Sequence, residues 1–550
     1  MFCPTAARPT LSDRAFATLL ITFTMLYHAI VGAQGFDMFD EGWSLTGFQQ
    51  IFNDPESVEY LFLYYLTNLV GGMWNSLFGW GGIYAFRLLT GLVLTLTALV
   101  VWRLLCPYLN RWLIFLGLFL SYLCSYYGIM VFYHNYLTAL LSVCAAFALF
   151  RALSKNNPAW MLLSGLLIGW NTFVRLPNVT LVGMIVLLIP HYMFQRDVRT
   201  SLKLGATAII GFAAGVLSVL LLMLLLGHLS IFLSAVEGGF SAASDSASTH
   251  NLSSMATTYL SVYLTVFTAG YTYNTYIIYF LGTLTSLWVV FSRRHQPAYV
   301  YLACLSLLIL HLLPLGSDFG IENMGENCVY LATPFTIGML GRWISHMGDH
   351  PKLRFALGTA SMLLVLAFAL RGGKHILKTC YFDEGLRTDK TYLPAASLAT
   401  TFTTAQNSQE LDTILQELSH YVKPGDELLC FQNMPMLHFL TQTRPYLGNP
   451  WVWSYDPSNM KRHFDLAEAK GHKQPIMVRE KTMIPHWLQP YPDWNNAHAK
   501  ESYLHKNQKI VLIQQFIKKN DYHVVWEDSV CQILVSQHRK EVVPANSKLR

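Results

Sequence analysis

Three carboxylates, Asp37, Asp40 and Glu41, stand within five residues of one another in the segment FDMFDEGW. The aromatic residues between them favour packing against a membrane surface, and burial of that kind raises the pKa of a carboxylate. A raised pKa suits a general base that takes a proton from a hydroxyl or an amine. A divalent cation held by Asp40 and Glu41 is a second interpretation, and a solvated acidic loop is a third. We therefore predict Asp40 and Glu41 as catalytic residues, with Asp37 as a further candidate in the same loop.

Four more residues have side chains that could bind a phosphate or a sugar. Arg87 and Arg175 carry guanidinium groups, whose fork matches phosphate oxygens. The alternative for Arg87 is that its guanidinium only reaches out to solvent and binds no phosphate. His134 and Asn135 could bind sugar hydroxyls or supply an acid-base partner, although a lone histidine is more often structural. We predict all four as donor-binding residues.

A polar, glycine-rich stretch at 316–327 contributes three outer-loop candidates, Asp318, Glu322 and Asn323. Its glycines would let a ligand approach the backbone closely. A plain flexible loop is an equal alternative.

The elements that hold these residues must be membrane helices, because 53% of the 550 residues are hydrophobic and only 13% are charged. Soluble proteins carry about 25% charged residues, so a soluble enzyme is excluded. The net charge of +6 comes from short basic clusters between apolar runs, which is typical of membrane topology and argues against nucleic-acid binding. The nine cysteines show no metal-binding spacing.

Hydropathy predicts about eleven transmembrane helices. The first, from Ala15 to about Gly32, is expected to be retained, although a cleaved signal peptide is the alternative. The segment from Ser57 to Phe78 is amphipathic, which favours a helix on the outer surface. The other predicted spans are 82–105, 111–130, 136–153, 159–175, 178–194, 203–227, 265–291, 297–315, 328–345 and 354–370.

Basic residues occur in every second predicted loop, and the positive-inside rule places those loops in the cytoplasm. The loops at 34–81, 228–256 and 316–327 contain no Lys or Arg and are predicted to face outward. The N-terminus is then cytoplasmic, and an odd number of spans places the C-terminal stretch outside. All the candidate residues above fall on the outer side.

The chain changes character after residue 371, where it becomes charged and rich in turn signals. We predict a multi-span domain at 1–371 and an extracytoplasmic α/β domain at 372–550. A helix is expected from Gln409 to Tyr421, and strands are expected at Glu427–Phe431, Ile476–Val478 and Val530–Val535. Four aromatic residues of this domain could stack on sugars, although core packing is favoured: Trp451, Trp453, Tyr455 and Trp487.

The order of the short motifs resembles the GT-C superfamily of membrane glycosyltransferases, which includes protein O-mannosyltransferases and an aminoarabinose transferase. The likeness rests on Phe39-Asp40-Glu41, the amphipathic outer segment, Phe86-Arg87-Leu88-Leu89, Gly165–Gly169 and Arg175-Leu176-Pro177, and it covers about the first 200 residues.

This resemblance implies transfer of a sugar from a polyprenyl-phosphate donor on the periplasmic face of a bacterial inner membrane, by inverting displacement. Asp40 would be the base, and Arg87 or Arg175 would stabilise the leaving phosphate. The acceptor, whether lipid, glycan or protein, stays open. A carrier or flippase for a lipid-linked sugar, and a polymerase or ligase of glycan chains, are the competing interpretations.

Overall fold

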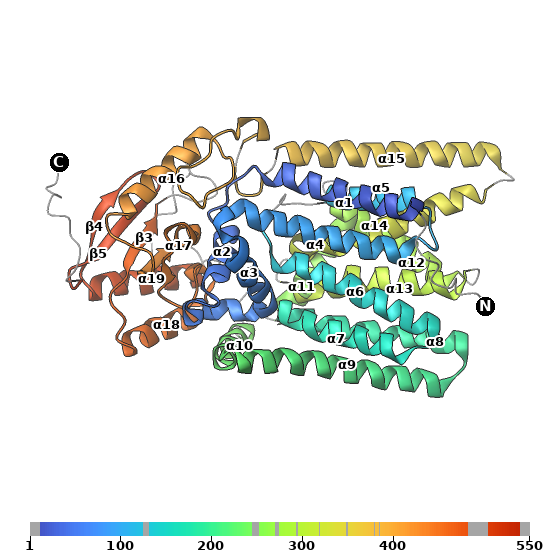
Figure 1. The fold of residues 1–550 in the computed structure, drawn as a ribbon, viewed down its shortest axis with the longest axis horizontal. Helices are drawn as coiled ribbons and strands as arrows, with labels where there is room; N and C mark the ends of the chain where they lie inside the picture. Colours follow the sequence, from blue (N-terminus) through green and yellow to red (C-terminus); the bar gives the residue numbers. More distant parts are fainter. Residues whose placement is uncertain are drawn as a thin grey trace.

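The computed structural model describes residues 11–539 except 125–130, 245–251, 270–273, 293–294, 318–319, 348–349, 379, 384 and 482–503. Figure 1 shows a bundle of long helices at one end and an α/β region at the other, with α2 (Asp40–Gln50) and α3 (Tyr65–Phe78) between them. The bundle helices are α1 (Leu11–Gly32), α4 (Gly82–Leu105), α5 (Arg111–Tyr122), α6 (His134–Lys155), α7 (Pro158–Val174), α8 (Leu188–Gln195), α9 (Val198–Leu225), α10 (Leu229–Ser244), α11 (Leu252–Ala269), α12 (Asn274–Phe291), α13 (Pro297–Leu312), α14 (Ile321–Ser345) and α15 (Pro351–Lys378).

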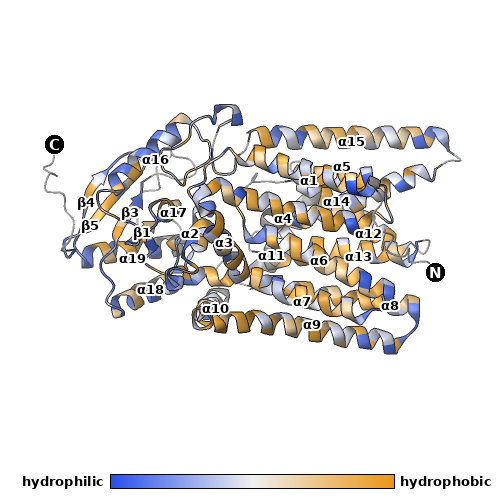
Figure 2. Ribbon diagram, viewed as in Figure 1, coloured by the Kyte–Doolittle hydropathy of each residue, from blue (hydrophilic) through white to orange (hydrophobic). Residues whose placement is uncertain are grey.

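Seven helical stretches among the described residues are long and apolar enough to cross a membrane. Four shorter apolar helices accompany them, at Arg111–Tyr122, Pro158–Val174, Leu229–Phe240 and Pro297–Leu312. Apolar residues cover the bundle, whereas polar residues dominate the α/β region (Figure 2). The chain is therefore a polytopic membrane protein, and the count of about eleven spans stays a prediction.

Close packing of α7 on α9 shows how the sequence builds the bundle. Gly165 and Gly169 face Gly211 and Gly215, and a Cβ added at Gly165 would lie 2.3 Å from the backbone oxygen of Ala208. Small residues four apart let two membrane helices approach until their backbones touch, which increases their van der Waals contact. Larger residues at these positions would force the two helices apart.

The end of the bundle beside the α/β region contains short helical segments that precede α4. The 3₁₀ helix η1 (Pro55–Tyr64) leads into α3, and the short η2 (Gly79–Gly81) connects α3 to α4. Helix α3 runs along the end of the bundle and packs against α2 (Figure 1). The predicted helical segment from Ser57 to Phe78 is thus helical, as η1 followed by α3, except for a kink at Val58, whose φ and ψ are not helical.

The α/β region contains a five-stranded sheet of order β2-β1-β3-β5-β4. β1 (Glu427–Phe431) is parallel to β2 (Arg444–Pro445) and β3 (Ile476–Glu480), whereas β5 (Cys531–Ser536) is antiparallel to β3 and β4 (Tyr522–Glu527). The sheet is accompanied by α16 (Ala405–Leu418), α17 (Met436–Thr441), α18 (Pro457–Ala469) and α19 (Leu504–Lys519). The predicted helix at 409–421 and the three predicted strands are confirmed in this region, with ends that shift by a few residues.

Two predicted boundaries differ from the structure. The span predicted at 111–130 corresponds to α5, which ends at Tyr122. The domain boundary predicted after residue 371 lies inside α15, which continues to Lys378. The described parts of the span predicted at 265–291 are helical and belong to α11 and α12, and residues 270–273 between them lie outside the described residues.

Candidate active site at the N-terminus of α2

Asp37 anchors the start of α2. Its Oδ1 accepts a hydrogen bond from the Phe39 N–H at 2.8 Å, and its Oδ2 accepts one from the Glu41 N–H at 2.9 Å. The first N–H groups of a helix lack partners within the helix, so the carboxylate supplies acceptors for them. Burial, together with the nearby Glu41 and Asp40 carboxylates, raises the pKa of Asp37 well above its usual range. This geometry favours a structural role for Asp37.

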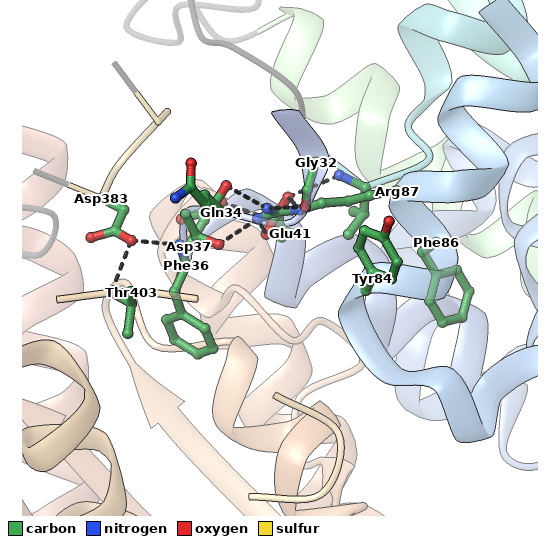
Figure 3. Close-up of polar contacts among 12 residues, drawn as sticks. Gly32, Gln34, Phe36, Asp37, Glu41, Tyr84, Phe86, Arg87, Asp383 and Thr403 are labelled. Atoms are coloured by element: carbon green, nitrogen blue, oxygen red, sulfur yellow. Dashed lines mark hydrogen bonds and ion pairs between the residues drawn. The ribbon is translucent and has the colours of Figure 1, made fainter. Parts of the chain in front are cut away.

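Glu41 and Arg87 form a buried ion pair (Figure 3). The Arg87 Nε donates to Oε1 of Glu41 at 2.9 Å, and Nη2 donates to Oε2 at 2.7 Å. The remaining donors reach the backbone oxygens of Gly32, Gln34 and Gly35, each at 2.9 Å. Arg87 therefore ties the end of α1 and the loop after it to α2 and α4.

The five N–H groups of the Arg87 guanidinium each have an acceptor in this arrangement. Glu41 also accepts a hydrogen bond from the Val131 N–H at 2.9 Å. With its donors occupied, Arg87 is badly placed for the predicted contact with a phosphate, and at 2% exposure it does not reach out to solvent either. The geometry favours a structural role for Arg87 and Glu41, and their donor-binding and catalytic roles stay predictions without support from these contacts.

Asp40 differs from the other two carboxylates because part of its surface stays open. Tyr381 donates a hydrogen bond to its Oδ2. The pKa of Asp40 is raised to about 6, since burial raises it, the Tyr381 hydrogen bond lowers it and the Glu41 charge raises it. A carboxylate with this pKa is mostly ionised at neutral pH and still basic enough to accept a proton.

Tyr381 is a site residue that the sequence prediction missed. It follows α15, lies 341 positions from Asp40, and adopts a φ of +39°, a left-handed conformation that non-glycine residues rarely adopt. Strained backbone of this kind clusters at functional sites. The only sequence signal was its place in the aromatic and acidic run Cys380–Asp383, directly after the last span.

The α/β region covers the loop after α1, which carries Asp37 and leads into α2. The Met436 N–H donates to the backbone oxygen of Met38 at 3.0 Å, and the Trp43 indole N–H donates to Oδ1 of Asn449 at 3.1 Å. A Cβ at Gly42 would lie only 2.1 Å from the backbone nitrogen of Met436, so only glycine permits this approach. The loop that carries Asp40 is therefore held between the bundle and the α/β region.

Another part of this cover comes from Trp451, one of the aromatic residues considered for sugar stacking. Its ring meets that of Phe39 edge to face at 4.3 Å, and its indole N–H donates to Oδ1 of Asn433 at 3.2 Å. Tyr455 is buried, and Trp453 packs on Phe431 at 5.6 Å. Core packing thus accounts for these three residues, whereas Trp487 lies outside the described residues.

His134 and Asn135 begin α6 and are buried. The His134 ring stacks on Tyr64 at 4.4 Å and lies 3.8 Å from the Tyr133 ring. Arg175, 7% exposed, lies between α7 and η3 (Leu176–Leu187) and interacts electrostatically with His134. The structure therefore brings three of the predicted donor-binding residues into one buried group.

Tyr133 connects this group to the carboxylate loop. It interacts electrostatically with Tyr381, which is itself bonded to Asp40. Asp40 is thus linked to Arg175, at the end of α7, by interactions through Tyr381, Tyr133 and His134.

The candidates predicted at 316–327 lie partly outside the described residues. Asp318 lies outside the described residues. Glu322 and Asn323 fall in the first turn of α14, and their side chains are not among those described. Glu326, one turn further along, is buried and interacts electrostatically with Cys124.

The described residues contain no group of three or more His, Cys, Asp or Glu side chains arranged to hold a metal ion. A cation shared by Asp40 and Glu41 would compete with the Arg87 guanidinium, which occupies both oxygens of Glu41. A second positive charge beside a buried guanidinium is unfavourable, so the residues fit such a cation poorly. The cation stays a prediction without support from this geometry.

Comparisons with known proteins give structural neighbours but no family. No protein-family model matches the chain, and no curated protein matches it. The apo structure of ArnT from Cupriavidus metallidurans aligns over 95% of this chain and 98% of its own, with 12% identity and a TM-score of 0.49. Arabinosyltransferase EmbB from Mycobacterium smegmatis aligns over 61% of this chain and 32% of its own, with 12% identity and a TM-score of 0.37. Both TM-scores lie below 0.5, so these likenesses assign no function to the chain.

Proposed function

We propose that the protein is a GT-C-type membrane glycosyltransferase that takes a sugar from a polyprenyl-phosphate donor, with Asp40 as the general base. The observation that carries the proposal is the division of labour among three neighbouring carboxylates. Asp37 anchors α2 and Glu41 binds Arg87, whereas Asp40 stays partly open and holds a pKa of about 6. This division supports Asp40 as the carboxylate that transfers the proton.

The reaction follows from that carboxylate. The acceptor hydroxyl oxygen attacks the anomeric carbon of the sugar while its proton passes to Asp40. The bond between that carbon and the phosphate oxygen breaks, and its electron pair leaves with the polyprenyl phosphate. Attack opposite the leaving group inverts the anomeric configuration.

Arg175 is the better of the two arginines for the leaving phosphate. Arg87 is occupied by Glu41 and three backbone oxygens, whereas Arg175 lies with His134 at the outer end of α6 and α7. A fixed cation in a site that excludes water stabilises charge developing on a phosphate. His134 and Asn135 would help to orient the donor.

The location proposed for this chemistry is the periplasmic face of a bacterial inner membrane. The loop between α8 and α9, which carries Arg196 and is followed by Arg199 in the first turn of α9, lies at the end of the bundle opposite the α/β region (Figure 1). The positive-inside rule would then place that loop in the cytoplasm and Asp40 outside. Nucleotide sugars are absent there, so a lipid-linked donor and a lipid, glycan or protein acceptor fit this side.

The test uses the full chain in lipid nanodiscs, with labelled polyprenyl-phosphate sugars as donors and a cell-envelope extract as acceptor source. We expect free polyprenyl phosphate to be released only when the protein is present. No sugar should be transferred when UDP-hexoses replace the lipid-linked donors. Arg175→Met should lower the release by about 10²-fold, as expected when a charge-stabilising donor is removed. Arg111→Met, at the start of α5, is the matched control and should match the unchanged protein.

Two results would overturn the proposal. One is passage of the intact lipid-linked sugar across the bilayer of a proteoliposome without any release of polyprenyl phosphate, which identifies a carrier. The other is an Arg175→Met protein that turns over as fast as the Arg111→Met control. Addition of many sugars to one acceptor, seen by mass analysis, would favour the polymerase interpretation over single transfer.

A further inference from the structure

A polar cavity lies at the opposite end of α2 from Asp40. It has a volume of about 700 Å³ and is lined by the end of α2, the α3–α4 connection and two loops of the α/β region. Because α2 has eleven residues, its two ends lie about 15 Å apart. The cavity is therefore separate from the candidate active site.

Amide side chains dominate the lining of this cavity. Five of its thirteen residues are Asn or Gln: Gln49, Gln50, Asn53, Asn75 and Gln442. An amide presents both hydrogen-bond donors and an acceptor, which is what a sugar hydroxyl requires because it donates one bond and accepts others. Among the described residues the Oε1 atom of Gln49 is buried without a hydrogen-bond partner, so this amide retains acceptor capacity.

The cavity has no net charge to attract an ionic ligand. Its two charged residues, Asp54 and Arg444, pair with each other at 3.1 Å. The Arg444 Nε also donates to the backbone oxygen of Gly425 at 2.8 Å, which fixes the guanidinium in the wall. A phosphate or carboxylate would have to displace Asp54 from this pair, so a neutral ligand fits better.

Trp80 gives the cavity a flat apolar surface at its rim. The side chain is 81% exposed and belongs to η2, directly before α4 enters the bundle. Tryptophan is common at membrane interfaces, and that alone would explain its position. Its place on an amide-lined cavity adds a second use, because aromatic faces pack against the apolar C–H face of a sugar ring.

We propose that this cavity is a binding site for a neutral saccharide, held by the amides and stacked on Trp80. Its position beside the start of α4 puts it at the level of lipid head groups, where the saccharide of a glycolipid or a free oligosaccharide could enter. The inference does not depend on the proposed catalytic role of Asp40, since it concerns binding alone.

The experiment measures binding to the full chain in nanodiscs by saturation-transfer NMR and by titration. One arm uses soluble maltotetraose and chitotetraose, and the other places monoglucosyl diacylglycerol or phosphatidylglycerol in the nanodisc. The variants are Trp80→Ala and Asn75→Ala, with Trp112→Ala as the matched control. Trp112 is 55% exposed on α5 and does not line the cavity.

We expect at least one of these saccharides to bind, and Trp80→Ala to weaken that binding about tenfold, the effect of losing one stacked aromatic side chain. Asn75→Ala should weaken it several-fold, and Trp112→Ala should have no effect. Binding only in the glycolipid arm would assign the site to a membrane-anchored saccharide, and binding in the soluble arm would assign it to a free one.

The inference is overturned if no saccharide in either arm binds, if Trp80→Ala and Trp112→Ala behave alike, or if phosphatidylglycerol competes as well as the sugars. Asp40→Asn separates this inference from the proposed function. It should keep saccharide binding unchanged, so loss of turnover and loss of binding report on different ends of α2.

Discussion

Breaking the buried pair between Glu41 and Arg87 should destabilise the fold strongly. Arg87→Met leaves the Glu41 carboxylate buried at 1% exposure without its cation, which costs about 3–5 kcal/mol. It also removes the donors to three backbone oxygens, and each buried oxygen left unsatisfied costs about 1–3 kcal/mol more before relaxation. Glu41→Gln should cost less, about 2–3 kcal/mol, because the guanidinium keeps its backbone acceptors.

The assay is unfolding of the full chain in detergent, followed by tryptophan fluorescence against denaturant. The control is Lys461→Met, which breaks an exposed pair with Asp465 and should cost at most about 1 kcal/mol. A Glu41→Leu/Arg87→Met double variant should lose less free energy of unfolding than the sum of the losses in the two single variants, because no charge is left buried alone.

Two results would refute the structural role of this pair. The first is an Arg87→Met protein as stable as the Lys461→Met control. The second is a Glu41→Gln protein that keeps its full stability and yet loses sugar transfer, since that result would return Glu41 to catalysis.

Three other predictions concern the surroundings of Asp40. Tyr381→Phe removes the hydrogen bond that lowers the pKa of Asp40, so that pKa should rise above about 6. The acid limb of the kcat/KM profile should then move to higher pH, with a several-fold loss of kcat/KM at pH 6 and little change at pH 8. An acid limb that does not move would contradict the assignment of Asp40 as the base. Gly42→Ala should push its Cβ into the Met436 backbone, loosen the α/β region from the loop that carries Asp37 and speed its proteolysis. Gly373→Ala is the control, because nothing lies within 4 Å of its Cβ and alanine favours the helix, so it should not speed proteolysis. A C-terminal alkaline phosphatase fusion should be active and a C-terminal green fluorescent protein dark, and the reverse would contradict the predicted orientation.

Local sequence patterns predicted the elements well because hydropathy and turn residues act over short distances. The strand at Glu427–Phe431 has the predicted ends, and α4 matches the span predicted at 82–105. The prediction failed at the end of α5, which stops at Tyr122 although apolar residues continue beyond it, because hydropathy alone does not mark that end.

The site was predicted only in part, and the reason differs from that for the helix ends. The carboxylates were visible as a local cluster, but their separate roles depend on partners distant in the chain. Glu41 is 46 positions from Arg87, and Asp40 is 341 positions from Tyr381. Residue type showed that Arg87 could bind an anion, and only the fold showed that the anion is Glu41.

The most direct test of the account measures the rate at which the Asp40→Asn protein releases polyprenyl phosphate in the first turnover. The stability of this protein is compared with that of the Asp37→Asn protein. Asparagine keeps the size of Asp40 and can still accept the Tyr381 hydrogen bond, but it cannot take a proton. We predict that Asp40→Asn folds normally and releases polyprenyl phosphate about 10²–10⁴ times more slowly than the unchanged protein. Release within twofold of the unchanged rate would contradict Asp40 as the base.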